Sequence, residues 1–170
     1  MSLFQILLVL LIPLVSAFPP PPHSSPPRAV FILSSTESRW ATKAVGDALK
    51  TLGFTHAVTA TNDPDALVEN SGGRKNTYSQ LSRDDTAAWQ RLASSMPDAR
   101  FILPADTVAE EIDDDIRRFF SANDNPDRLL ELFVGRRVPA DQAENWVTLC
   151  RFLGLGYSVV ERLKLWYFPR

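Results

Sequence analysis

The sequence has 170 residues, a length typical of one domain. Hydrophobic residues make up 45% and charged residues 22%, as in ordinary folded soluble proteins. The formal net charge of -2 excludes a strongly basic footprint for nucleic acid or a polybasic patch for a membrane surface. The only cysteine, Cys150, can form no internal disulfide, and with His23 and His56 it can build no metal-ligand cluster.

The first residues are typical of a targeting signal. Residues 3–15 are almost wholly apolar, and the small residues Ser16 and Ala17 follow them. The run is too short for a comfortable membrane span, which needs about 20 apolar residues. We therefore predict a cleaved signal peptide over residues 1–17 and a secreted protein, or one in the lumen of the secretory pathway, with no membrane contact after cleavage. No Lys or Arg precedes the apolar run, so an uncleaved anchor and no targeting role remain alternatives.

A proline-rich stretch separates this signal from the rest of the chain. More than half of residues 18–28 are proline, which lacks an amide donor and favours polyproline II. Such a stretch predicts a stiff linker. The folded domain is therefore expected over residues 29–170.

The domain begins with the pattern of a buried strand. Residues 29–33 form a continuous apolar run, as expected for a strand covered on both faces. Apolar residues then recur at helical spacing from Ala41 to Leu52, and Gly53 ends the helix. Residues 56–60 predict a second strand.

The polar stretch that follows predicts a long loop over residues 62–85, with room for a short helix at 64–69. Beyond it, three helices and two strands are expected: a helix at 86–95, a strand at 100–103, a helix at 107–120, a strand at 128–134 and a helix at 141–153 that Gly154 closes.

Four strands alternating with helices indicate crossover connections and a parallel sheet. We therefore predict an α/β fold of three layers: a four-stranded, mainly parallel sheet with helices on both faces. We expect Cys150, in an apolar helix, to be a small core residue rather than an intermolecular bridge or a reactive thiol. In such a sheet, ligands bind where strand carboxyl ends meet helix N-termini. We therefore expect any ligand site at residues 34–43 or at residues 104–115.

Three segments in chain order resemble the P-loop sulfotransferase family, especially its short fungal-type members. Residues 47–54 read DALKTLGF, similar to the family's EALKxLGF. WQRL at 89–92 and MPDARFIL at 96–103 are similar to ELxxAYPDAKFIL, the helix and strand that lead to the 3′-phosphate site. RLLEL at 128–132, Trp146, LCRFLG at 149–154 and the terminal FPR are similar to RLLEF…W..LCRFLG…FPR. The resemblance covers most of residues 28–170 and implies a P-loop-type α/β scaffold.

The family binds 3′-phosphoadenosine 5′-phosphosulfate, and the resemblance implies where its 5′ end would lie. Arg39 aligns with the basic residue of the family's phosphate loop, Thr42 with a phosphate-contacting threonine, and Lys43 is a further nearby cation. The loop departs from the family in having no glycine, which a close backbone nest around phosphate needs, and in placing Glu37 nearby. Two interpretations stay open: a serine-rich helix cap with an exposed arginine, or residual binding of a nucleotide or other anion by Arg39, Thr42 and Lys43.

The 3′-phosphate site is the second departure. The family's motif RDPxxWxxS has no arginine here, Asp106 is the only match, and the serine position falls near Asp113. Asp113, Asp114 and Asp115 with two preceding glutamates would place negative charge toward an anionic nucleotide. Adjacent helical carboxylates point in different directions, so we favour a solvated helix face over a divalent-cation site and predict no metal.

No catalytic base can be assigned. His56 does not align with a family base, and we favour a structural role at a strand end. The sequence thus predicts a degenerate sulfotransferase-like protein of the secretory pathway that acts in binding or interaction, without efficient sulfuryl transfer. The alternative is an active sulfotransferase that uses 3′-phosphoadenosine 5′-phosphosulfate on an unknown hydroxyl acceptor. A third possibility is a secreted structural or effector-like domain that shares only the scaffold.

Overall fold

A computed structural model describes most of the predicted domain: residue 27 and residues 29–57, 76–105, 111–122, 125–135 and 139–170. The predicted signal peptide lies outside the described residues, as does the predicted linker apart from Pro27. Within the described part of the chain, no helix is both long and apolar enough to cross a membrane.

The strands lie at β1 (Ala29–Ser34), β2 (Thr55–His56), β3 (Thr77–Ser82), β4 (Arg100–Ala105) and β5 (Leu129–Phe133). The α-helices lie at α1 (Arg39–Thr51), α3 (Thr86–Ser95), α4 (Glu111–Ala122), α5 (Pro139–Phe152) and α6 (Tyr157–Arg162), and a short 3-10 helix, η2 (Pro126–Arg128), precedes β5. The predicted α/β class is confirmed.

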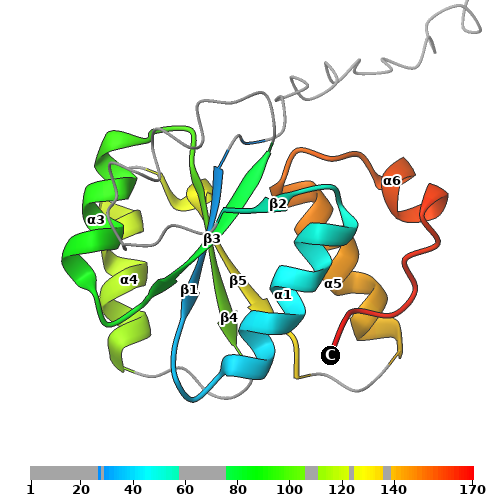
Figure 1. Cartoon of the computed structure of the whole chain (residues 1–170), viewed down its shortest axis with the longest axis horizontal. Helices are drawn as coiled ribbons and strands as arrows, with labels where there is room; N and C mark the ends of the chain where they lie inside the picture. Colours follow the sequence, from blue (N-terminus) through cyan, green and yellow to red (C-terminus); the bar gives the residue numbers. More distant parts are fainter. Residues whose placement is uncertain (1–26, 28, 58–75, 106–110, 123–124, 136–138) are drawn as a thin grey trace, which may run out of the picture.

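The strands form one parallel sheet in the order β2-β3-β1-β4-β5. Helices cover both faces: α1, α5 and α6 lie on one side and α3 and α4 on the other (Figure 1). The three-layer parallel arrangement is therefore confirmed, whereas the predicted count of four strands is wrong, since the described sheet has five.

The central strand β1 is buried on both faces, and its apolar sequence follows from this position. Its residues are buried along almost its whole length, with Val30 and Ile32 in the core under α1 and α5, and Phe31 and Leu33 in the core under α3 and α4. Because successive side chains alternate between two buried faces, the strand appears as a continuous apolar run.

The missed strand is β3, which lies beside β1 within the stretch that the sequence predicted to be a loop. Tyr78, Gln80 and Ser82 share one face of the sheet, the face that α1 covers, and two of the three are polar. A central parallel strand is normally apolar on both faces, so this polar pattern concealed it. Gln80 and Ser82 line a cavity instead of packing in a core.

The other elements lie close to their predicted positions. Gly53 and Gly154 have φ angles of 90° and 68°, which supports the predicted helix ends, because a left-handed residue after a helix favours glycine. The predicted residues 58–60 of the second strand and 107–110 of the fourth helix lie outside the described residues. The short helix α6 was not predicted; it is held by the buried Val160.

Cys150 is confirmed as a buried core residue. It is 1% exposed and packs in the cluster under α1 and α5. Burial raises the pKa of its thiol to about 11, so little reactive thiolate is present at neutral pH.

Candidate ligand-binding site

A cavity of about 460 Å³ opens where the carboxyl ends of β1 and β3 meet the helix α1. This volume lies within the 300–1,000 Å³ that is usual for small-molecule sites. Its lining consists of Ser34, Ser35, Thr36, Arg39, Thr42, Lys43, Gly46, Asp47, Lys50, Tyr78, Gln80 and Ser82. The cavity therefore lies at the first of the two places that the sequence indicated.

One stripe of α1 forms the helical wall of the cavity. The lining residues of this helix recur three and four positions apart from Arg39 to Lys50, as a single helix face requires. The neighbouring stripe, which includes Ala41, Val45 and Leu49, is buried in the core. Helical spacing from Thr42 and Lys43 could have identified Gly46, Asp47 and Lys50, which were not predicted.

All three predicted binding residues lie on this wall. Arg39 and Lys43 are exposed, and Thr42 is buried at 4% exposure. The Thr42 hydroxyl oxygen is buried and has no hydrogen-bond partner in the structure. An unsatisfied buried hydroxyl costs about 1–3 kcal/mol, so this atom is expected to gain free energy from any ligand or water that reaches it.

The charge of the cavity is positive. Its lining includes three cations, Arg39, Lys43 and Lys50, and one carboxylate, Asp47. Asp47 Oδ2 accepts a bond of 2.7 Å from Lys43 Nζ, and Asp47 Oδ1 accepts one of 3.0 Å from Lys50 Nζ. These bonds, that from Lys43 first, hold the pKa of Asp47 below its usual range, so this carboxylate stays ionised at neutral pH. Glu37, which the sequence placed near the anion, is not among the lining residues.

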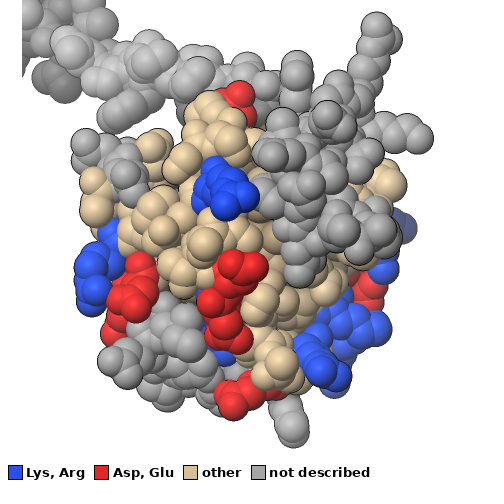
Figure 2. Space-filling model, turned by 60° about the vertical axis from the view of Figure 1, so that its left-hand side comes forward, with Lys and Arg blue, Asp and Glu red and all other residues tan. Residues whose placement is uncertain are grey.

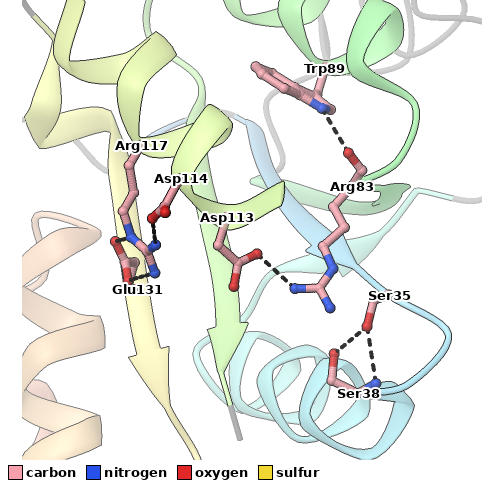
Figure 3. A network of polar contacts seen from close by, with 8 residues as sticks. All are labelled: Ser35, Ser38, Arg83, Trp89, Asp113, Asp114, Arg117 and Glu131. Carbon is pink, nitrogen blue, oxygen red and sulfur yellow. Dashed lines mark hydrogen bonds and ion pairs between the residues drawn. The ribbon is translucent and has the colours of Figure 1, made fainter. Parts of the chain in front are cut away.

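The turn before α1 is closed by serine side chains instead of glycine. Ser38 donates its backbone N–H to Ser35 Oγ at 3.2 Å, and the two hydroxyl oxygens lie 3.0 Å apart (Figure 3). The Ser38 side chain makes no capping bond to α1. Because the Ser38 amide is already bonded to Ser35, this turn differs from a glycine-rich nest, in which successive backbone amides are directed at a phosphate.

The acidic helix α4 differs from the predicted solvated face. Asp113 is buried at 5% exposure, and its Oδ1 accepts a bond of 2.8 Å from Arg83 Nη1 (Figure 3). Asp113 lies three and seven residues before the buried Ile116 and Phe120, so it belongs to the inner stripe of the helix. The prediction of a solvated face was therefore wrong for Asp113.

Asp114 and Asp115 are solvent-exposed, as predicted, but each is paired with an arginine on its own helix. Arg117 Nη1 donates to Asp114 at 2.6 Å, and Arg118 Nη1 donates to Asp115 at 2.8 Å. Figure 2 shows basic and acidic side chains interspersed over this side of the molecule. No described residue of α4 lines the cavity, so none of the described carboxylates of α4 stands in its wall. Asp106 lies outside the described residues, and the described residues contain no cluster that could hold a metal ion.

His56 lies at the end of β2, as predicted for a strand-end residue. Its ring packs against Tyr78 with 4.9 Å between the ring centroids, and it is not among the lining residues. Burial raises the pKa of the Tyr78 phenol. The described lining therefore offers a strongly ionised carboxylate and a neutral phenol, and neither is matched to proton transfer near neutral pH.

Comparison with known proteins gives no family for this chain: no family model, no curated protein and no solved structure matches it.

Proposed function

We propose that this chain is a degenerate sulfotransferase-like protein that binds a phosphate- or sulfate-bearing ligand without efficient sulfuryl transfer. The observation that carries the proposal is the position of Thr42, whose hydroxyl is buried and unpartnered, on the wall of a cavity beside Arg39 and Lys43. The N-terminal end of α1 adds the positive end of a helix dipole at the same place. An anion there would satisfy the hydroxyl and the cations together.

The residues present fit one end of the sulfotransferase cofactor. Arg39, Thr42 and Lys43 would hold the 5′ phosphosulfate end of 3′-phosphoadenosine 5′-phosphosulfate, which supplies an activated sulfuryl group when bound. The family's 3′-phosphate site would lie at α4, and no described residue of this helix contributes a cation to the lining. The described lining also has no group suited to act as a base toward an acceptor hydroxyl. Both points favour binding over transfer.

The test is a substitution that removes the hydroxyl oxygen of Thr42 from the site. Thr42→Val has nearly the same shape but no hydroxyl, so it should leave the fold as stable as before, or more stable, because a buried unsatisfied group is lost. Wild-type protein should be stabilised by inorganic sulfate or phosphate and by 3′-phosphoadenosine 5′-phosphate, by about 2.7 kcal/mol at a hundredfold excess over the dissociation constant. Thr42→Val and Arg39→Ala should lose most of this stabilisation, as measured by thermal unfolding with and without ligand.

Two variants outside the cavity serve as controls. Thr51→Val makes the same change at the other end of α1, where Thr51 Oγ1 donates to Asp47 O, and Arg91→Ala removes an exposed arginine from α3. Both should keep the ligand-induced stabilisation. Absence of any stabilisation of the wild-type protein by these anions at millimolar concentration would contradict the proposal.

We also propose that the protein acts in the secretory pathway, on the strength of the apolar run over residues 3–15. The expected outcome of expression in a secreting cell is protein in the medium whose N-terminal sequence begins near Phe18. Protein that stays in the cell with Met1 at its N-terminus would contradict this localisation.

A further inference from the structure

The cavity is larger than a single anion requires, and most of the residues that line it beyond the anion-binding end carry polar groups. Apart from Gly46 and the ring of Tyr78, every lining residue carries a hydroxyl, carboxamide or charged group. Small-molecule sites are usually lined mainly by apolar and aromatic side chains, with a few polar groups among them. The polar groups of these residues can form hydrogen bonds to a ligand whose organic part is itself rich in such groups.

Strand β3 lines the cavity with Tyr78, Gln80 and Ser82, and its polar residues stand beside apolar residues of β1. Val30 pairs with Tyr78, and Ile32 with Gln80, in the register between β1 and β3. The β1 partners are fully buried in the core, whereas Gln80 lies beside them on the next strand and is exposed. A polar side chain on the helix-covered face of a parallel sheet loses the core packing that an apolar residue would have there. Because Gln80 lines the cavity, its carboxamide is placed to form hydrogen bonds with a ligand.

Gly46 extends the cavity toward Tyr78. Glycine is, after proline, the least favourable residue in a helix interior, and a Cβ built at position 46 would lie 3.5 Å from the Tyr78 hydroxyl, an ordinary contact. Packing therefore does not require glycine here. The missing side chain instead leaves the Tyr78 hydroxyl at the cavity wall, next to the helix turn that carries Asp47 and Lys50.

From this arrangement we propose that the ligand is a phosphate or sulfate monoester of a hydroxyl-rich group such as a sugar. The inference rests on the proposed function, because the ester anion would lie at Arg39, Thr42 and Lys43. The hydroxyls would extend along α1 to Asp47, Gln80 and Tyr78. Sugar hydroxyls both donate and accept, and these three side chains supply a carboxylate acceptor, a carboxamide and a phenol.

The test is calorimetric titration of the whole chain with matched probes: glucose 6-phosphate, glucose 6-sulfate, hexyl phosphate, inorganic phosphate and inorganic sulfate. One of the two sugar esters should bind about tenfold more tightly than its inorganic anion and than hexyl phosphate, as expected for about two good hydrogen bonds. The preferred ester identifies the anion as phosphate or sulfate. Free glucose should bind too weakly to detect.

Variants separate the two ends of the site. Tyr78→Phe keeps the ring, and Gly46→Ala fits the space beside it, so both should fold and reduce sugar-ester binding about threefold or more while inorganic anion binding is unchanged. Thr42→Val should weaken both kinds of ligand. Tyr157→Phe, at an exposed tyrosine on α6, is the matched control and should change neither.

Two outcomes would overturn the inference, and they can be told apart. If inorganic anions bind but the sugar esters bind no more tightly than hexyl phosphate, the anion site stands and the hydroxyl-rich ligand is wrong. If no anion of any kind binds the wild-type protein, the proposed function and this inference fail together.

Discussion

Replacing Asp113 with alanine is expected to lower the free energy of unfolding by about 3–5 kcal/mol, the usual cost of removing one partner from a buried ion pair. The side chains of Arg83 and Asp113 are only 6% and 8% exposed, so the variant leaves the guanidinium charge in a poorly hydrated place without this carboxylate. A domain of this size has a stability of about 5–15 kcal/mol, so the loss is a large share of the total. Chemical denaturation monitored by tryptophan fluorescence would measure it.

The same helix offers a matched control. Asp115→Ala breaks a pair whose side chains are 69% and 74% exposed, and such pairs contribute about 0–1 kcal/mol. The double variant Arg83→Met with Asp113→Leu should be more stable than Asp113→Ala, because it removes both charges and fills the space with apolar atoms. Equal stability losses for Asp113→Ala and Asp115→Ala would show that the Arg83–Asp113 pair is not buried in solution.

The pair also has a bearing on the cavity. Arg83 belongs to the turn after β3, and its backbone N–H donates to Ser34 O at 3.0 Å. Its carbonyl accepts a bond of 3.1 Å from Trp89 Nε1 (Figure 3). The turn that Asp113 helps to hold is therefore bonded directly to the end of β1, where Ser34 lines the cavity.

Replacing Arg128 with methionine is expected to cost about 2–4 kcal/mol, because its guanidinium holds a turn through three backbone carbonyls at once. Nη1 donates to Ala93 O at 3.0 Å, Nη2 to Met96 O at 2.7 Å and Nε to Ala99 O at 3.1 Å. The carbonyls of Ala93 and Met96 lie at the end of α3, where a helix lacks intrahelical partners. Hydrogen bonds from a charged donor each contribute about 1.5–3 kcal/mol before solvent exposure reduces them.

Arg128→Lys distinguishes charge from geometry. Lysine keeps the positive charge but cannot reach three carbonyls with a planar fork, so we expect a loss of about half that of Arg128→Met. Arg91→Lys, at an exposed arginine on α3, should leave the free energy of unfolding unchanged within about 0.5 kcal/mol. Thermal and denaturant unfolding would give the differences. If Arg128→Lys proved as stable as the wild-type protein, the three-carbonyl arrangement would not be the source of the stability.

Arg128 also bears on the resemblance, because it opens the segment RLLEL that is similar to the sulfotransferase pattern. Its bonds to the α3–β4 turn and its position over the Phe101 ring, 5.7 Å from the centroid, are those of a residue that holds the scaffold. The similar segments at residues 47–54, 96–103 and 149–154 likewise lie mostly in helix ends, β4 and its preceding turn. Among the residues of these segments, only Asp47 and Lys50 line the cavity.

Much of the architecture could be predicted from local pattern. The apolar run of β1 and the helical spacing in α1 each report which faces of the element are buried, and burial on both faces of a strand appears directly in its residues. The predicted binding residues Arg39, Thr42 and Lys43 followed from their position after the central strand, where parallel sheets bind ligands, together with the resemblance. The structure brings all three to one cavity.

What only the tertiary structure decided depends on contacts between distant segments. The polar pattern of β3 predicts a loop unless its neighbour is known, and only the pairing with β1 and the cavity under α1 explain why Gln80 and Ser82 stand in a strand. Asp113 lies on the inner stripe of α4, and its charge is paired there by Arg83, 30 residues earlier, a partner that no local pattern contains. The sequence by itself determined the helix and sheet layers of this protein, because buried side chains recur with a characteristic period along each helix and strand. The tertiary structure decided the extent and polarity of its cavity, because two segments far apart in the chain form the walls.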